Sequence, residues 1–265
     1  MRQLVIDFNV DVGPYAFREL PATGVKDVAG LLSRFGITQA VVAATPAITY
    51  CSPHPANELL AADLAQAAVD GIVPYAVLNP VYPGWEADLD RCVGLGFRGL
   101  KLYPNYHAYD VAGEQAVALV RAAASQGLPA IVCLRVEDER HHHPLMKVPP
   151  VPADAVAVLA RRVPEAVLIL CGGAAGETVA FLEATDRPET LAEISYLKSP
   201  LNAIEEMVET VGSERLLFGS HLPFVYPQVA LAKVREAYIS DEDKAKILWG
   251  NAQRVLGAPA GRSAS

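Results

Sequence analysis

The chain has 265 residues, 52% of them hydrophobic, and a formal net charge of −8. A chain of this length and composition forms a substantial core and is not intrinsically disordered. The acidic balance, without any run of basic residues, argues against nucleic acid or an anionic membrane as a partner. No apolar stretch is long enough for a membrane span and no signal peptide is visible, so we expect a cytoplasmic protein with reduced cysteines.

Strand patterns alternate with helix patterns along nearly the whole chain. Strands are expected at residues 4–7, 40–44, 73–78, 99–103, 130–134, 167–171, 191–196 and 215–219. Helices are expected at residues 25–35, 55–69, 84–95, 112–125, 153–162, 176–184, 202–211, 229–238 and 241–249. Eight such repeats predict an α/β fold with a parallel sheet, closed as a (β/α)8 TIM barrel.

A doubly wound open sheet is the alternative fold, but no strand is followed by a glycine-rich phosphate loop. We expect one barrel domain over residues 1–257 and a disordered tail of small residues at 258–265. The longest irregular stretch, residues 135–152, is typical of a lid or binding segment. Three consecutive histidines lie within it, and because adjacent side chains diverge, a polar loop is favoured there over a metal site.

The first strand carries three polar side chains at alternating positions, Asp7, Asn9 and Asp11. Alternation along a strand places all three on the same face. A strand that simply runs into a solvated turn at Gly13 would look the same. In a barrel, however, this face lies at the end where active sites form.

Five segments resemble the amidohydrolase-related family of TIM-barrel metal-dependent hydrolases, the amidohydrolase 2 type, in the order that this family has. They are IDFNVDVG at 6–13, FRGLKLYP at 97–104, GLPAIV at 127–132, RLLFGS with PF at 215–224, and ILWGNA at 247–252. The resemblance implies the barrel fold, a metal-activated water as nucleophile, and the homodimer common among such barrels.

The resemblance also implies metal ligands that this chain lacks. The family uses two histidines after strand one, one histidine each after strands five and six, and an aspartate after strand eight. The corresponding positions here are Asn9 and Asp11, Cys133, Gly172 and His221. Asn9 is a poor ligand and Gly172 is none, so the ordinary zinc mechanism is in doubt.

Ionisable side chains that remain at the barrel mouth suggest other chemistry. Strands one and eight are neighbours in a closed barrel, so Asp11 could orient His221 as a general base. Lys101 could polarise a carbonyl or bind a carboxylate, although a structural pair with Asp7 or Asp11 is equally compatible. Arg135 could clamp an anion in a bidentate fork, against the alternative of a surface salt bridge with a nearby carboxylate.

We therefore predict that His221, Asp11 and Lys101 are catalytic, and that Asn9, Arg135, His107 and Tyr103 bind substrate. In a version with a rearranged metal site, Asp7, Asp11 and His221 would hold one divalent ion of manganese, magnesium or zinc. In the other version no cofactor is needed.

Two functions follow from these residues. The first is a hydrolase for a small carboxylated ester, lactone or amide, acting without a metal or with a rearranged site. The second is a non-catalytic barrel, a pseudo-hydrolase used for binding or assembly. The expected partner in the first case is a small-molecule substrate.

Overall fold

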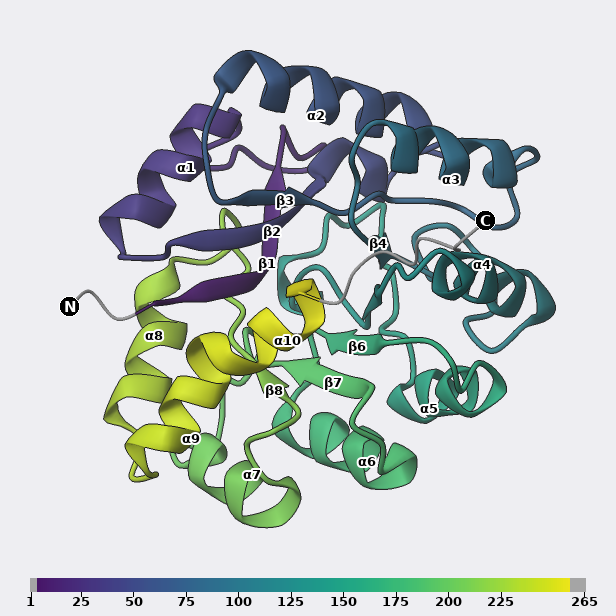
Figure 1. The fold of residues 1–265 in the computed structure, drawn as a ribbon. Helices are drawn as coiled ribbons and strands as arrows, with labels where there is room; N and C mark the ends of the chain where they lie inside the picture. Colours follow the sequence, from purple (N-terminus) through teal and green to yellow (C-terminus); the bar gives the residue numbers. More distant parts are fainter. Residues whose placement is uncertain (1–3, 258–265) are drawn as a thin grey trace.

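Eight parallel strands surround a common centre in the computed structural model, which describes residues 4–257 (Figure 1). The strands are β1 (Ile6–Val12), β2 (Gln39–Ala44), β3 (Ile72–Pro74), β4 (Leu100–Leu102), β5 (Ala130–Cys133), β6 (Leu168–Cys171), β7 (Thr190–Glu193) and β8 (Leu216–Leu217). Their order and parallel pairing confirm the predicted (β/α)8 barrel.

Helices cover the outside of the barrel (Figure 1). They are α1 (Val25–Arg34), α2 (His54–Ala67), α3 (Trp85–Gly94), α4 (Glu114–Ser125), α5 (Ala153–Arg162), α6 (Ala175–Thr185), α7 (Ala203–Val211), α8 (Pro227–Glu236), α9 (Asp241–Ala245) and α10 (Asn251–Gly257). In α1 the buried side chains are Val25, Val28 and Leu32, a spacing that places one apolar stripe against the strands. Within the described chain, none of the helices is long and apolar enough to cross a membrane.

Several element boundaries differ from the predictions by a few residues, and two of the differences have a visible cause. The first strand ends at Val12 instead of residue 7, because it pairs with β2 on one side and with residues 218–222 on the other. The helix expected at 241–249 is interrupted by a π-helical turn, Lys246–Gly250, and continues as α10. The predicted tail at 258–265 lies outside the described residues.

The barrel wall consists of two sheets, β1-β2-β3 and β4 to β8, joined at two seams. At one seam a single bridge pairs Val10 with Leu222, and at the other a single bridge pairs Ala76 with Leu100. Backbone hydrogen bonds support both seams, among them Phe8 N to Phe218 O at 2.8 Å and Ala76 N to Gly99 O at 2.8 Å. The circle of strands is therefore closed by few contacts at these two places.

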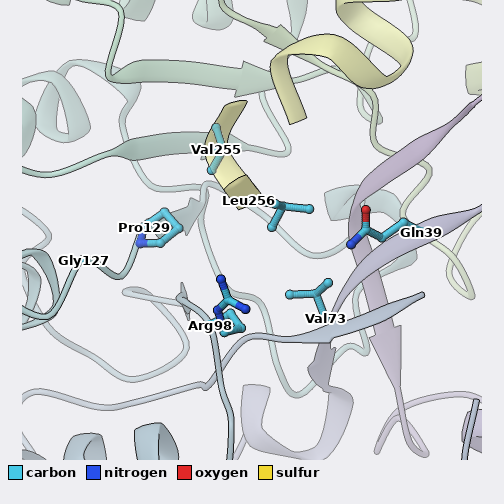
Figure 2. Close-up of a pocket in the computed structure, with 7 residues that line it drawn as sticks. All are labelled: Gln39, Val73, Arg98, Gly127, Pro129, Val255 and Leu256. Atoms are coloured by element: carbon cyan, nitrogen blue, oxygen red, sulfur yellow. The ribbon is translucent and has the colours of Figure 1, made fainter. Parts of the chain in front are cut away.

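The N-terminal end of the barrel is covered by α10, which contacts both β1 and β8. A cavity of about 60 Å³ remains between Val255 and Leu256 of α10 and residues at the starts of the strands, including Gln39 and Arg98 (Figure 2). This space is too small for an organic substrate. The longer loops lie at the opposite end of the barrel, where the strands end.

Gly219, just after β8, lies where any larger residue would collide with buried groups. A Cβ atom there would overlap the Glu193 carboxylate and come within 3.1 Å of the Asn9 Cβ. We expect Gly219→Ala to lower the free energy of unfolding by about 2–4 kcal/mol, because the barrel interior cannot expand to admit a methyl group.

Urea unfolding measures this change, and Gly30→Ala in α1 is the matched control. No heavy atom lies within 4 Å of a Cβ built at Gly30, so this substitution is expected to raise stability by up to about 1 kcal/mol. Equal unfolding midpoints for wild type and Gly219→Ala would contradict the packing argument.

Candidate functional site

The polar face of β1 points into the barrel, as the alternation along the strand predicts. Asp7, Asn9 and Asp11 are 0%, 1% and 1% exposed. Polar groups buried this deeply need hydrogen-bond partners, because an unpaired one costs several kcal/mol in a protein interior. The partners of these three side chains define the polar interior of the barrel.

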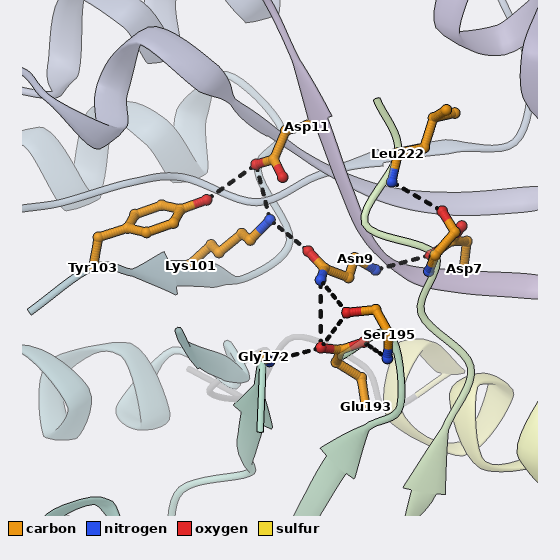
Figure 3. A network of polar contacts seen from close by, with 10 residues as sticks. Asp7, Asn9, Asp11, Lys101, Tyr103, Gly172, Glu193, Ser195 and Leu222 are labelled. Atoms are coloured by element: carbon orange, nitrogen blue, oxygen red, sulfur yellow. Dashed lines mark hydrogen bonds and ion pairs between the residues drawn. The ribbon is translucent and has the colours of Figure 1, made fainter. Parts of the chain in front are cut away.

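Lys101 of β4 supplies the cation for this interior (Figure 3). Its ammonium donates to Asp11 Oδ1 at 2.8 Å and to Asn9 Oδ1 at 2.9 Å, and the side chain is 2% exposed. The Tyr103 hydroxyl donates to the same Asp11 oxygen at 3.0 Å. Although burial alone would lower it, the Asp11 carboxylate raises the pKa of Lys101 above its ordinary value. Lys101 thus stays charged as the partner of Asp11.

Glu193 at the end of β7 is a second buried carboxylate of this network, and the sequence prediction missed it. Its Oε1 accepts hydrogen bonds from Asn9 Nδ2 at 3.3 Å, Ser195 Oγ at 2.9 Å and the Gly172 backbone N–H at 2.8 Å. Its other oxygen accepts from the Ser195 N–H at 2.7 Å. The signal in the sequence is a charged residue at 193 inside the weak apolar strand pattern at 191–196.

Asp7 is held by backbone donors. Its Oδ1 accepts from the Asn9 N–H at 3.0 Å and from the Ser220 N–H at 2.9 Å, which ties β1 to the end of β8. Complete burial raises the pKa of Asp7 from 3.8 to about 7. Asp7 therefore contributes to joining the strands.

His221 follows β8 and has an unusual backbone conformation, with φ at +60°. Its N–H donates to Asn9 O at 2.8 Å, and its carbonyl accepts from the Val225 N–H at 3.0 Å. The ring packs against Phe224 with a centroid distance of 4.9 Å. Left-handed backbone at a non-glycine residue is held by its surroundings and concentrates at functional sites.

Burial lowers the pKa of His221 to about 4, so the imidazole is neutral at neutral pH. In the described chain its ring makes no hydrogen bond to Asp11, whose Oδ1 accepts from Lys101 and Tyr103 instead. The predicted Asp11–His221 pair is therefore corrected. Asp11 acts only at a distance, as a negative charge that opposes the lowering of the His221 pKa.

A cavity of about 620 Å³ lies at the C-terminal end of the strands, beside His221. Its walls come from the segments after β5, β7 and β8, from Arg18 and from α8. Val136, Leu197 and Phe224 contribute apolar surface. A mostly apolar cavity with a few polar groups is the usual form of a small-molecule site.

Charged side chains in this cavity leave one cation without a partner. Arg18 pairs with Glu137 at 2.6 Å, and Lys198 pairs with Asp138 at 2.9 Å. Lys233 of α8 is half-buried in the cavity wall and, within residues 4–257, makes no hydrogen bond or ion pair. The cavity is thus suited to an anionic group.

None of the predicted substrate-binding residues lines this cavity. Arg135 donates two hydrogen bonds of 2.6 Å to Glu177 and one of 2.8 Å to the Gly172 carbonyl, so the predicted anion clamp is corrected to a structural ion pair. His107 is buried, with Nε2 at 3.0 Å from Ala47 O, and burial lowers its pKa.

The predicted catalytic role of Lys101 and the predicted substrate-binding roles of Asn9 and Tyr103 are also corrected, because these residues lie away from the cavity. Asn9, Lys101 and Tyr103 are at most 2% exposed and bind one another and Asp11, away from the cavity wall. Of the seven residues predicted as catalytic or substrate-binding, only His221 faces the cavity.

The residues at the implied ligand positions do not fit a divalent metal. The oxygens of Asn9 and Asp11 that face the interior contact the ammonium of Lys101, and Gly172 offers no side chain. Among residues 4–257, no group of three or more His, Cys, Asp and Glu side chains is placed to hold a metal ion. The predicted metal trio of Asp7, Asp11 and His221 is therefore corrected.

Sequence comparison identifies one family. The amidohydrolase family model matches residues 11–258 of the chain. No protein of curated function matches the chain.

Solved structures with the same fold cover almost the whole chain. A 5-carboxyvanillate decarboxylase from Sphingomonas paucimobilis has a TM-score of 0.77 at 15% identity, covering 97% of this chain and 99% of that one. A dihydroxybenzoic acid decarboxylase from Polaromonas, with bound manganese and an inhibitor, has a TM-score of 0.73 at 18% identity, with 96% of each chain covered. A candidate 2-pyrone-4,6-dicarboxylic acid hydrolase from Pseudomonas putida has a TM-score of 0.69 at 18% identity, covering 98% and 100%. At these identities the likeness shows the fold.

Asp7 makes stability depend on pH in a definite direction. Between pH 3.8 and about pH 7 the folded chain keeps the Asp7 proton and the unfolded chain loses it. Stability contributed by Asp7 therefore falls as the pH rises through this window. In Asp7→Asn this titration is absent, and we expect the stability difference, wild type minus variant, to fall by about 1.4 kcal/mol per pH unit there. Urea unfolding at several pH values measures it, and a constant difference would show that Asp7 titrates normally.

Proposed function

The chain belongs to the amidohydrolase family, and from this premise we propose that it hydrolyses a small carboxylated ester, lactone or amide without a resident metal. The observation that carries the proposal is the neutral imidazole of His221 beside a large, mostly apolar cavity with an unpaired cation. In this proposal His221 is the general base and Lys233 binds the substrate carboxylate.

His221 supplies the proton transfers of hydrolysis. The imidazole removes a proton from a water molecule while the water oxygen attacks the substrate carbonyl carbon. It then returns that proton to the leaving oxygen or nitrogen, whose bond to the carbonyl carbon breaks. Because the imidazole is neutral at neutral pH, it is ready to accept the proton without a prior deprotonation.

Lys233 supports the preference for a carboxylated substrate. An ammonium in a partly desolvated wall attracts an anion more strongly than an exposed one does. Burial and the nearby Lys198 already lower the pKa of Lys233, and a bound carboxylate relieves that cost. The named compounds of the three similar structures, a carboxyvanillate, a dihydroxybenzoic acid and a pyrone dicarboxylic acid, also share a carboxylated ring.

A binding barrel without catalysis is the second candidate, and the Lys101 network favours it. The family's chemistry depends on a metal at a position where this chain has a lysine bonded to Asn9 and Asp11. In that case the cavity would bind an anionic ligand that is released unchanged. Calorimetric binding with no product from any compound of a carboxylated panel would support this function.

Replacing His221 tests the catalytic proposal directly. Asparagine tolerates left-handed backbone, so His221→Asn keeps the loop geometry and removes the base. We expect kcat on the best substrate of a panel of carboxylated esters, lactones and amides to fall by a factor of about 100 or more, with KM little changed. For the wild type, kcat/KM should be flat around neutral pH and fall below about pH 4, where His221 becomes protonated.

Product analysis by mass spectrometry follows the same reactions. Full turnover by His221→Asn would contradict the assignment of the base. Release of carbon dioxide instead of addition of water would replace hydrolysis by decarboxylation as the activity.

Replacing Lys233 tests the anion site. We expect Lys233→Met to raise KM for a carboxylated substrate by a factor of about 10–100 and to leave KM for its neutral methyl ester within about twofold. Lys244→Met is the matched control, since Lys244 lies on α9 and bonds to Arg235 O, away from the cavity. Equal effects of Lys233→Met on both substrates would show that Lys233 binds no carboxylate.

A further inference from the structure

We propose that Arg18 is a further catalytic residue, whose guanidinium stabilises the oxyanion that forms when water adds to the substrate carbonyl. This inference rests on the proposed function and supplies a group that the mechanism there lacks. His221 moves protons and Lys233 binds the carboxylate, but neither compensates for charge on the carbonyl oxygen. As the water oxygen bonds to the carbonyl carbon, the π electron pair of the carbonyl moves onto its oxygen, and a fixed donor must meet that charge.

Arg18 lies in the segment between β1 and α1 and is fixed by two acceptors. Its Nε donates to Glu137 Oε1 at 2.6 Å, and its Nη2 donates to the Phe224 carbonyl at 3.3 Å. Within residues 4–257 its Nη1 donates no hydrogen bond. The residue lines the large cavity, and its side chain is 40% exposed. The guanidinium is therefore held in place and still has N–H groups for a ligand.

The Phe224 ring brings this guanidinium close to the general base. Arg18 Cζ lies 5.4 Å from the centroid of the Phe224 ring, and the centroid of the His221 ring lies 4.9 Å from it. The two groups are thus no farther apart than these distances combined. A base, the water it activates, the carbonyl group and an oxyanion donor together span roughly 8–10 Å, so both groups can act on one substrate. The positive charge of Arg18 also contributes to the lowered pKa of His221.

Neighbouring donors on the ends of β7 and β8 already have acceptors. Ser195 donates both its hydroxyl and its backbone N–H to Glu193. The backbone N–H of His221 donates to Asn9 O. Redirecting any of these groups to a substrate would break a hydrogen bond of the polar interior, which costs free energy. Arg18 Nη1 is available without such a loss, which favours it as the oxyanion donor.

The cations of the cavity therefore have different roles. Lys198 acts electrostatically on Lys233 and helps to lower its pKa, so these two ammonium groups lie near each other, where the carboxylate binds. The carboxylate is charged in the substrate and in the transition state alike, so Lys233 affects KM. The oxyanion exists only after attack, so Arg18 affects kcat. When the electron pair returns from this oxygen to the carbonyl bond, the leaving group departs with the proton from His221.

Arg18→Met tests the proposal in the full-length protein, with the panel of carboxylated esters, lactones and amides. We expect kcat to fall by a factor of about 100, with KM within about threefold of the wild-type value. Arg140→Met is the matched control, because Arg140 also pairs with a carboxylate of the segment after β5, Asp138, but does not line the cavity. Its kcat should stay within about twofold of wild type.

Added guanidinium ion separates a donor from a structural role. Arg18→Ala leaves space for this ion beside Glu137, and we expect guanidinium chloride, far below denaturing concentrations, to raise its kcat at least about 10-fold. Guanidinium should not raise the kcat of wild type or of Arg140→Met. If loss of Arg18 unfolds the protein because Glu137 is left unpaired, the double variant Arg18→Met, Glu137→Gln has no unpaired charge there, and the same fall in kcat is expected.

Two results would overturn the proposal while the proposed function stands. One is a low kcat in His221→Asn together with a nearly unchanged kcat in Arg18→Met. The other is a fall in kcat for Lys198→Met but not for Arg18→Met, which would make Lys198 the donor. Full turnover by His221→Asn, by contrast, contradicts the proposed function itself. A wild type that hydrolyses no compound of the panel overturns both.

Discussion

The contact between Lys101 and Asp11 is the interaction on which the barrel interior depends. The two residues come from different sheets of the wall, β4 and β1, so their 2.8 Å contact joins the sheets across the centre instead of along a ladder. Through Asn9 the same ammonium is linked to Glu193 of β7. One buried ammonium thereby links three strands, β1, β4 and β7.

That arrangement separates two tasks that a metal would otherwise combine. In a metal-dependent barrel the ion both neutralises the buried ligands and activates water. Here Lys101, which is only 2% exposed, neutralises the buried Asp11 carboxylate, while the cavity lies toward β8 and the segment after β5. His221 links the polar interior to the cavity, since its N–H donates to Asn9 O and the residue lines the cavity.

The fold was predictable because apolar strands and amphipathic helices repeat with a regular period, and each element forms largely from its own residues. The shared face of Asp7, Asn9 and Asp11 followed from strand alternation for the same reason. The site was less predictable, because the hydrogen-bond and ion-pair partners of its side chains come from strands that are far apart in the sequence. Arg135 was expected to bind an anion but meets Glu177, 42 residues later, and no local pattern marks that pairing. Lys233 was missed because a single lysine on an amphipathic helix resembles any solvated residue.

The seam between β1 and β8 is one of the two places where the barrel wall is held by few backbone contacts. A single bridge and a few backbone hydrogen bonds close it there, whereas β5 and β6 pair through four consecutive residues. His221 and Leu222 lie on this seam, at the edge of the cavity. A molecule bound in the cavity would therefore contact the β8 side of the seam and stabilise the closed barrel. Because few hydrogen bonds close the seam, local opening of the barrel costs least there, and a ligand bound beside the seam would oppose that opening.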